Sequence, residues 1–196
     1  MTDPATPPVT IRMLGAAAAA GARDALAALL VDAVAHGASV NFMAGFTDAA
    51  ARAFWDDQFP AIAAGGRLLL AAEAGPELVG CVVLTLAPQP NAPHRAEIGK
   101  MLVHSAWRRR GIGRRLLGAA EEAARAAGRS LLLLDTEAGS AGETLYRRCG
   151  WSAIGSVPDH AFTPDGRLAA TTMFYKNLTG TLTQSAAAPP HPAVAR

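Results

Sequence analysis

The sequence has little cysteine, and what it has does not form a recognisable site. It contains two, Cys81 and Cys149, and neither belongs to a Cys-x-x-Cys pair. Its five histidines show no spacing typical of a metal site. We therefore expect reduced, buried thiols in a cytoplasmic protein that holds no metal.

The chain also has little net charge for its length. Charged residues make up 17% of 196 residues, the formal net charge is +2, and hydrophobic residues make up 51%. This composition is typical of a globular chain rather than a disordered one. The basic residues gather in one turn instead of spreading along a face, which favours a local anion site over a nucleic-acid surface.

No uninterrupted apolar run is long enough to cross a membrane. The alanine-rich segment 14–38 comes closest, but Arg23, Asp24, Asp32 and His36 interrupt it and its apolar residues follow helical spacing. We expect an amphipathic helix there. No secretory leader opens the chain, so the sequence gives no reason to expect contact with a membrane.

Composition divides the chain into one domain and two tails. Residues 1–8 are polar and proline-rich, and residues 179–196 are rich in small residues and proline without any periodicity. We predict a flexible N-terminal tail, a single domain over 9–178 and a disordered C-terminal tail. No internal repeat is visible.

Periodicity and turn signals predict strands alternating with helices inside the domain. The continuous apolar run 130–134 is typical of a strand that is buried on both faces, hence parallel and central. The expected strands cover 9–14, 67–73, 78–86, 95–104, 130–135, 151–157 and 171–176, the expected helices 21–36, 47–58, 112–127 and 141–149, and the main loops 38–45 and 158–169.

The most informative stretch, residues 97–117, reads as a strand, a basic turn and the start of a helix. Gly111 and Gly113 stand where the helix begins, so backbone N–H groups can approach a ligand closely. A helix N-terminus offers unpaired donors and the positive end of the macrodipole, which favours phosphate. Guanidinium groups suited to phosphate surround the turn, from Arg108, Arg109, Arg110, Arg114 and Arg115. No lysine follows as the Walker loop requires, and Leu116 stands where the dinucleotide fingerprint needs a small residue.

The spacing that does match is R-x-x-G-x-G/A, present as RRRGIG at residues 108–113. Further on come LLLLDT and then ETLYRRCGW. In these motifs the chain resembles the Gcn5-related N-acetyltransferases, and the runs GKMLVH, LDTEAGS and TTMFYKNL look most like the tabtoxin-resistance type. The resemblance covers residues 9–178. It implies an α+β fold whose mostly antiparallel sheet is flanked by helices and has parallel central strands that splay apart.

The resemblance also implies a place for acetyl-CoA. Its pyrophosphate would lie on residues 108–114 and its pantetheine arm between strands 95–104 and 130–135, where a bulge near Met101–Val103 frees backbone groups. Many family members have Asn where Gly139 stands, so Ser140 would supply that contact. The expected cofactor-binding residues are Met101, Leu102, Val103, Arg108, Arg109, Arg110, Gly111, Ile112, Gly113, Arg114 and Ser140.

Acyl transfer to an amine needs a base for the ammonium proton and an acid for the departing thiolate. Glu97 and Asp135 match positions with catalytic roles in tabtoxin-resistance-like enzymes, and Tyr146 matches the tyrosine that hydrogen-bonds the CoA sulfur. The sequence leaves structural alternatives open for all three. Glu97 could pair with a neighbouring cation, Lys100 or Arg95; Asp135 could cap the turn at 136–139; Tyr146 could pack against the sheet.

The resemblance implies an enzyme that acetylates a primary amine of a small amino-acid-like, antibiotic or toxin acceptor by direct attack. A protein lysine or N-terminal acetyltransferase, and a non-catalytic acyl-CoA sensor, are the alternatives. Loops 38–46 and 158–169 would shape the acceptor pocket, with Asn41, Phe42, Met43 and Phe46 as candidate contacts that could equally be core. Related folds often dimerise, so the sequence leaves a homodimer open.

Overall fold

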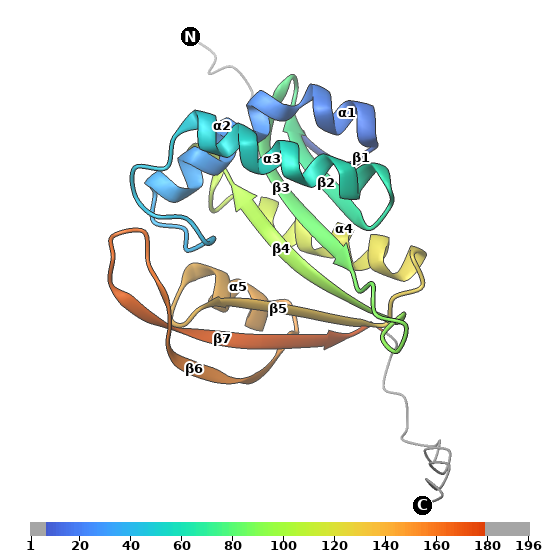
Figure 1. Cartoon of the computed structure of the whole chain (residues 1–196), viewed down its shortest axis with the longest axis vertical. Coiled ribbons are helices and arrows are strands. Elements are labelled where there is room, and N and C mark those ends of the chain that lie inside the picture. Colours follow the sequence, from blue (N-terminus) through green and yellow to red (C-terminus); the bar gives the residue numbers. More distant parts are fainter. Residues whose placement is uncertain (1–6, 179–196) are drawn as a thin grey trace, which may run out of the picture.

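A computed structural model describes residues 7–178 as one mixed sheet with helices on both faces (Figure 1). The sheet has seven strands in the order β1-β2-β3-β4-β5-β7-β6. Every neighbouring pair is antiparallel except β4 and β5, which are parallel. The strands are β1 (Val9–Leu14), β2 (Arg67–Ala74), β3 (Glu77–Leu86), β4 (Arg95–Val103), β5 (Leu131–Glu137), β6 (Ser152–Phe162) and β7 (Leu168–Asn177). The predicted fold class is confirmed. Most of the predicted N-terminal tail and all of the predicted C-terminal tail lie outside the described residues.

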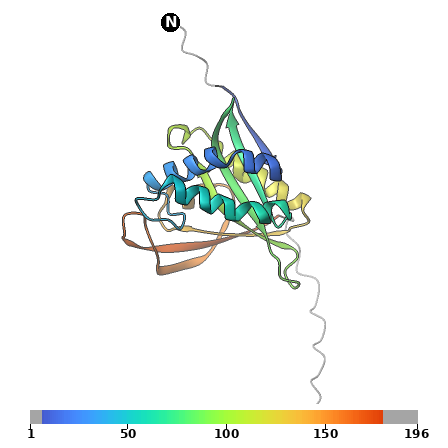
Figure 2. The same cartoon turned by 45° about the horizontal axis from the view of Figure 1, so that its top comes forward.

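Two apolar cores lie on opposite faces of the sheet. One face is covered by α1 (Ala16–Gly21), α2 (Arg23–Ala35) and α3 (Asp48–Ala63) (Figure 2). The core beneath them includes the fully buried Trp55. On the other face α4 (Ile112–Ala126) and α5 (Ala141–Arg148) pack around the fully buried Phe174. A 3-10 turn, Ser105–Trp107, lies between β4 and α4. None of the described helices combines the length and the apolarity needed to cross a membrane.

The helical prediction was wrong at two places. The helix expected over 21–36 is α2, but the separate short helix α1, which ends at Gly21 just before it, was not predicted. The helix capped by Thr47 was expected to stop before Pro60, yet α3 continues to Ala63. Proline removes one hydrogen bond inside a helix, but Ile62 beyond it is buried, and Ala64 N–H donates to the Pro60 carbonyl. Packing of the last turn therefore outweighs the missing bond.

The C-terminal hairpin is longer than predicted. Residues 158–169 were expected to form a loop, but β6 runs to Phe162 and β7 begins at Leu168. The pairing shifts register between Val157 and Ala161, with Asp159 at φ 47°, so residues 158–160 bulge out of the ladder. The strand survives the proline because β6 is the edge of the sheet, and Pro158 lies within the bulge.

The parallel pair separates soon after it forms. Only three register pairs join β4 to β5, and the last is Glu97 with Leu133. Beyond it the two strands diverge toward the C-terminal end of α2 (Figure 1). Opposite β3 the register also shifts: Val83 pairs with Gly99, whereas Cys81 pairs with Leu102. The predicted splay is present, and β4 carries its bulge on the side facing β3.

Candidate functional site

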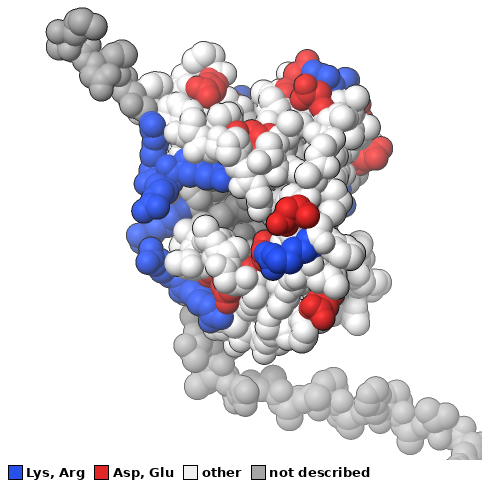
Figure 3. All heavy atoms as spheres, turned by 90° about the vertical axis from the view of Figure 1, so that its left-hand side faces the viewer, with Lys and Arg blue, Asp and Glu red and all other residues white. Residues whose placement is uncertain are grey.

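A cavity of about 1020 Å³ occupies the space between the diverging strands. Its lining comes from β4, β5, the C-terminal end of α2, the first turn of α4 and most of α5. Figure 3 looks at the open end of the splay and shows lysine and arginine side chains gathered along one side of that face. A single cavity therefore connects the basic turn with the splayed strands.

The bulge in β4 lies at the wall of this cavity. Lys100 and Met101 together face the single residue Val82, and Lys100 has φ 44°, a left-handed value that is rare for a side chain of its size. The sequence placed the bulge near Met101–Val103, and the structure places it at Lys100–Met101. From Ile98 onward β5 does not pair with β4, so this strand edge faces the cavity.

The residues of the predicted anion cradle lie at the first turn of α4. Gly111 is the N-cap at φ 77°, and no side chain caps the helix. The N–H groups of Ile112, Gly113 and Arg114 therefore have no partner within the helix. Before them Arg109 adopts φ 63°. Three positively charged groups, Arg109, Arg114 and Arg148, line the cavity around these donors.

The other arginines of the turn serve different contacts. The Arg108 guanidinium donates to the Val103 and His36 carbonyls at 3.2 and 3.5 Å, so it ties the cradle to α2 while still lining the cavity. Arg110 stacks on Trp107 and does not line the cavity. Arg115, expected beside the phosphate, turns away and donates to the Val9 carbonyl at 2.7 Å.

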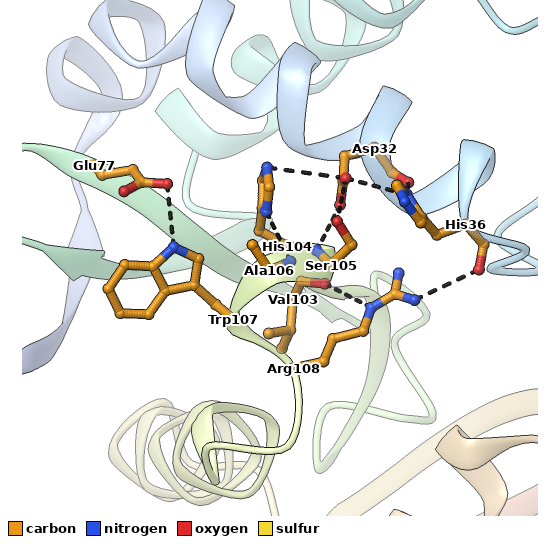
Figure 4. A network of polar contacts seen from close by, with 9 residues as sticks. All are labelled: Asp32, His36, Glu77, Val103, His104, Ser105, Ala106, Trp107 and Arg108. Atoms are coloured by element: carbon orange, nitrogen blue, oxygen red, sulfur yellow. Dashed lines mark hydrogen bonds and ion pairs between the residues drawn. The ribbon is translucent and has the colours of Figure 1, made fainter. Parts of the chain in front are cut away.

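A polar network centred on Asp32 holds the turn in place (Figure 4). The Asp32 carboxylate accepts hydrogen bonds from the backbone N–H and the hydroxyl of Ser105, both at 2.7 Å. His36 Nδ1 lies 3.2 Å and His104 Nε2 3.9 Å from the same carboxylate. Burial raises the pKa of Asp32, but the Ser105 bonds and the two histidines outweigh it, so the net pKa is lowered.

Ser140 has a structural partner as well as a place in the lining. Its hydroxyl accepts from Glu143 N–H at 3.1 Å as the N-cap of α5, and the Glu143 side chain returns to Gly139 N–H. The sequence Ser-x-x-Glu is that of a capping box, but the Glu143 carboxylate accepts from Gly139, one residue before the N-cap. The Gly139 bond and Arg147 lower the pKa of Glu143.

The two candidate bases lie on the same face of the sheet. In β4 the neighbours of Glu97, Ala96 and Ile98, are buried under α4, and in β5 Leu134 is buried next to Asp135. Since side chains alternate along a strand, both carboxylates point the other way, and both line the cavity. Among the described residues neither forms an ion pair or a side-chain hydrogen bond. The structure therefore shows no side-chain hydrogen bond from Asp135 to the described turn at 136–139.

The Tyr146 ring is buried and its edge lines the same cavity. Its ring centroid lies 6.0 Å from that of Trp151 and 6.1 Å from that of Phe174. Burial, followed by the nearby Asp135 and Cys149, raises the pKa of Tyr146 to about 12. The phenol therefore keeps its proton near pH 7. Tyr146 can therefore pack against Trp151 and Phe174 and still present its hydroxyl to the cavity.

Lys100 is the site residue that the sequence reasoning missed. Its Nζ lies 5.4 Å from the Phe54 ring centroid and 5.7 Å from that of Phe42. Burial lowers the pKa of Lys100, while Asp135 and Glu97 raise it. The only sequence signal for a role of Lys100 in the site is its position directly before Met101. Its aromatic neighbours, Phe42 and Phe54, come from distant segments of the chain.

The two predicted acceptor loops touch. Ala44 N–H donates to the Pro164 carbonyl at 2.9 Å, and Arg167 pairs with Glu137 at 2.9 Å. Together with the end of α2 they line a second, open-sided pocket of about 420 Å³, which includes Phe46 and shares Gly37 and Glu137 with the large cavity. Asn41 lines the large cavity, Phe42 packs on Phe46, and Met43 is exposed.

Known proteins resemble this chain in sequence pattern and in fold. The model of the acetyltransferase (GNAT) family matches residues 31–151. The solved structure of yncA from Salmonella typhimurium, with its cofactor acetyl-CoA, is 19% identical, covers 91% of this chain and 99% of its own, and has a TM-score of 0.70. A ribosomal-protein-alanine N-acetyltransferase from Brucella melitensis is 26% identical, with 86% and 99% covered and a TM-score of 0.70. A structure described as a phosphinothricin N-acetyltransferase is 18% identical, with 88% and 99% covered and a TM-score of 0.70.

Proposed function

The chain belongs to the acetyltransferase (GNAT) family, and we propose that it transfers the acetyl group of acetyl-CoA to a primary amine of a small, amino-acid-like acceptor. One observation carries the proposal. A single cavity runs from the α4 cradle, along the unpaired edge of β4, to Glu97, Asp135 and Tyr146. The assignment to the tabtoxin-resistance type, a cytoplasmic location and a homodimer stay predictions.

The residues that line the cavity fit acetyl-CoA. Unpartnered N–H groups at the start of α4, with Arg109, Arg114 and Arg148, would bind the phosphates. The edge of β4 beyond Glu97 offers backbone groups to an amide-bearing arm, as an added strand would. Bound there, acetyl-CoA supplies an acetyl group activated as a thioester. Met101, Leu102 and Val103 then contribute backbone groups rather than side chains.

The acceptor side has the groups that an amine needs. An alkyl ammonium with a pKa of about 10 must lose its proton before it can attack. Asp135 and Glu97 face the cavity, pair with no other residue of 7–178, and can take that proton, directly or through water. Tyr146 holds a proton on its hydroxyl and would give it to the departing sulfur. Both carboxylates also attract a cationic acceptor.

The size of the acceptor side favours a small molecule over a polypeptide. The bond from Ala44 to Pro164 joins the two acceptor loops, which line an open-sided pocket of only about 420 Å³. A protein substrate, which the description of the Brucella enzyme names for that enzyme, would need these loops to move apart. Protein acetylation is therefore the second candidate.

A thiol-release assay across a panel of amines tests the proposal. We expect CoA release with small amino-acid-like amines and little with peptides that match ribosomal N-termini. Turnover with peptides alone would favour the second candidate. Calorimetric binding of acetyl-CoA without turnover of any amine would indicate an acyl-CoA sensor instead.

A further inference from the structure

Lys100 places a primary amine of the protein itself in the large cavity, which Glu97 and Asp135 also line. The side chain projects from the β4 bulge, lines the cavity and lies over the rings of Phe42 and Phe54. Glu97 is on the same strand, three residues earlier. The expected substrate is a primary amine, and the chain already holds one beside the groups proposed to activate it.

The groups around Lys100 come from four strands. Asp135 faces it from β5, Arg67 from β2, Cys81 from β3 and Glu97 from β4. Burial and Arg67 lower the pKa of the ammonium, and the two carboxylates and the thiol act in the opposite direction, with a lowered pKa as the net result. A larger share of Lys100 is therefore in the neutral form that has a free lone pair.

The second lysine of the chain provides a contrast. The sequence has sixteen arginines but only two lysines, Lys100 and Lys176. Lys176 Nζ lies 2.8 and 2.9 Å from the two Glu121 oxygens and donates to the Cys149 carbonyl at 2.8 Å. These contacts occupy its three donors. Among the described residues, Lys100 forms no ion pair.

We propose that Lys100 is an internal acetyl acceptor, modified on Nζ by acetyl-CoA held in the same cavity. The inference rests on the proposed function, because it uses the same bound thioester and the same base and acid. It goes beyond that function by assigning a modification site on the enzyme itself.

The step balances without any further reactant. The neutral Nζ forms a bond to the acetyl carbonyl carbon, the carbon–sulfur bond breaks, and its electron pair leaves on sulfur. The proton lost by nitrogen passes to Asp135 or Glu97, and sulfur takes a proton from Tyr146. The products are acetyl-Lys100 and free CoA. Asp135 and Glu97 then face a neutral amide instead of a cation.

Peptide mass spectrometry of the intact protein after incubation with acetyl-CoA tests the inference. Holding two reactants in one cavity raises rates by orders of magnitude, so we expect Lys100 to be acetylated at least ~10-fold faster than Lys176. The Lys100 rate should saturate with acetyl-CoA and fall when CoA is added as competitor. In urea both lysines should react at equal, slow rates. Equal rates in the folded protein would overturn the inference.

Two variants and a chemical probe complete the design. Lys100→Arg keeps the positive charge and should remove the acetylated species, whereas Lys176→Arg should leave it. Acetic anhydride, which needs no enzyme activity, should label Lys100 less when CoA is bound, with Lys176 unaffected. Lack of CoA protection would count against a shared cavity.

The outcomes separate this inference from the proposed function. Turnover of a free amine with Lys100 unmodified overturns the inference and leaves the proposed function standing. Acetylation of Lys100 without turnover of any free amine supports the inference and overturns the proposed function.

Discussion

A Cβ atom on Gly113 would lie 3.1 Å from Cδ2 of Leu145, so the first turn of α4 packs directly against α5. Sequence reasoning assigned this glycine to close approach of a phosphate. The structure adds a second reason, because α5 also carries Tyr146. The contact between these two helices therefore sets the separation between the anion cradle and the proposed acid.

We expect Gly113→Val to displace Leu145 and to weaken acetyl-CoA binding by at least ~10-fold, which corresponds to about 1.4 kcal/mol. Gly118 in the same helix is the matched control, because nothing lies within 4 Å of a Cβ built there. Gly118→Ala should raise the free energy of unfolding by about 0.5–1 kcal/mol and leave the affinity unchanged. Calorimetry measures both variants, and an unchanged dissociation constant for Gly113→Val would contradict the packing argument.

Tyr146→Phe should lower kcat by ~10²-fold, the usual contribution of a general acid, while acetyl-CoA binds nearly as well. The ring still fills its place against Trp151 and Phe174, so only the proton is lost. Because the pKa of Tyr146 is raised to about 12, its hydroxyl stays protonated through the neutral range. Tyr146 should therefore cause no fall in kcat on the basic side of that range. Steady-state rates paired with a binding isotherm provide the test, and wild-type turnover would remove Tyr146 from the mechanism.

Asp135→Asn should reduce kcat/KM more than Glu97→Gln does. Asp135 lies beyond the last β4–β5 pair and influences both Lys100 and Tyr146, whereas Glu97 belongs to that last pair. A base that acts directly contributes ~10²-fold or more, and we expect a smaller loss, about tenfold, for one that acts through water. The pH–rate profiles of the two variants decide the order. If Glu97→Gln loses the acidic limb and Asp135→Asn keeps it, the assignment is reversed.

Asp32→Asn should destabilise the protein at neutral pH by about 1 kcal/mol, the scale of one hydrogen bond. Asp32 has a lowered pKa in the folded protein, so its stabilisation is present above the unfolded value of about 3.9 and is lost as pH falls through the folded value. Urea unfolding of both proteins across the acid range should show the difference shrinking toward zero. A difference that stays constant with pH would mean that the charge on Asp32 does not contribute.

Local sequence signals predicted the elements that build the site. The run before His104, the glycine turn and the helical spacing after Ile112 gave strand, cradle and helix within one or two residues. They also placed Glu97 and Asp135 on neighbouring parallel strands, which the register confirms. These features depend on patterns that repeat every two to four residues, and a single sequence is enough to show such patterns.

What the sequence could not predict depends on long-range contacts. Arg108 and Arg115 bind carbonyls 72 and 106 residues away, so no local pattern distinguishes them from phosphate ligands. Lys100 acquires its surroundings from Phe42 and Phe54. The continuation of α3 past Pro60 likewise depends on the burial of Ile62.

The bulge in β6 also bears on how the molecule behaves at high concentration. β6 is an eleven-residue edge, and Ile154 and Phe162 on it are 65% and 56% exposed. A long, straight, apolar edge invites strands of other molecules to add and continue the sheet. Two register shifts, one between Ala153 and Gly155 and one at 158–160, where Pro158 lacks a donor, divide this edge into three short pieces that do not share one register. These interruptions thereby guard against fibrous self-association.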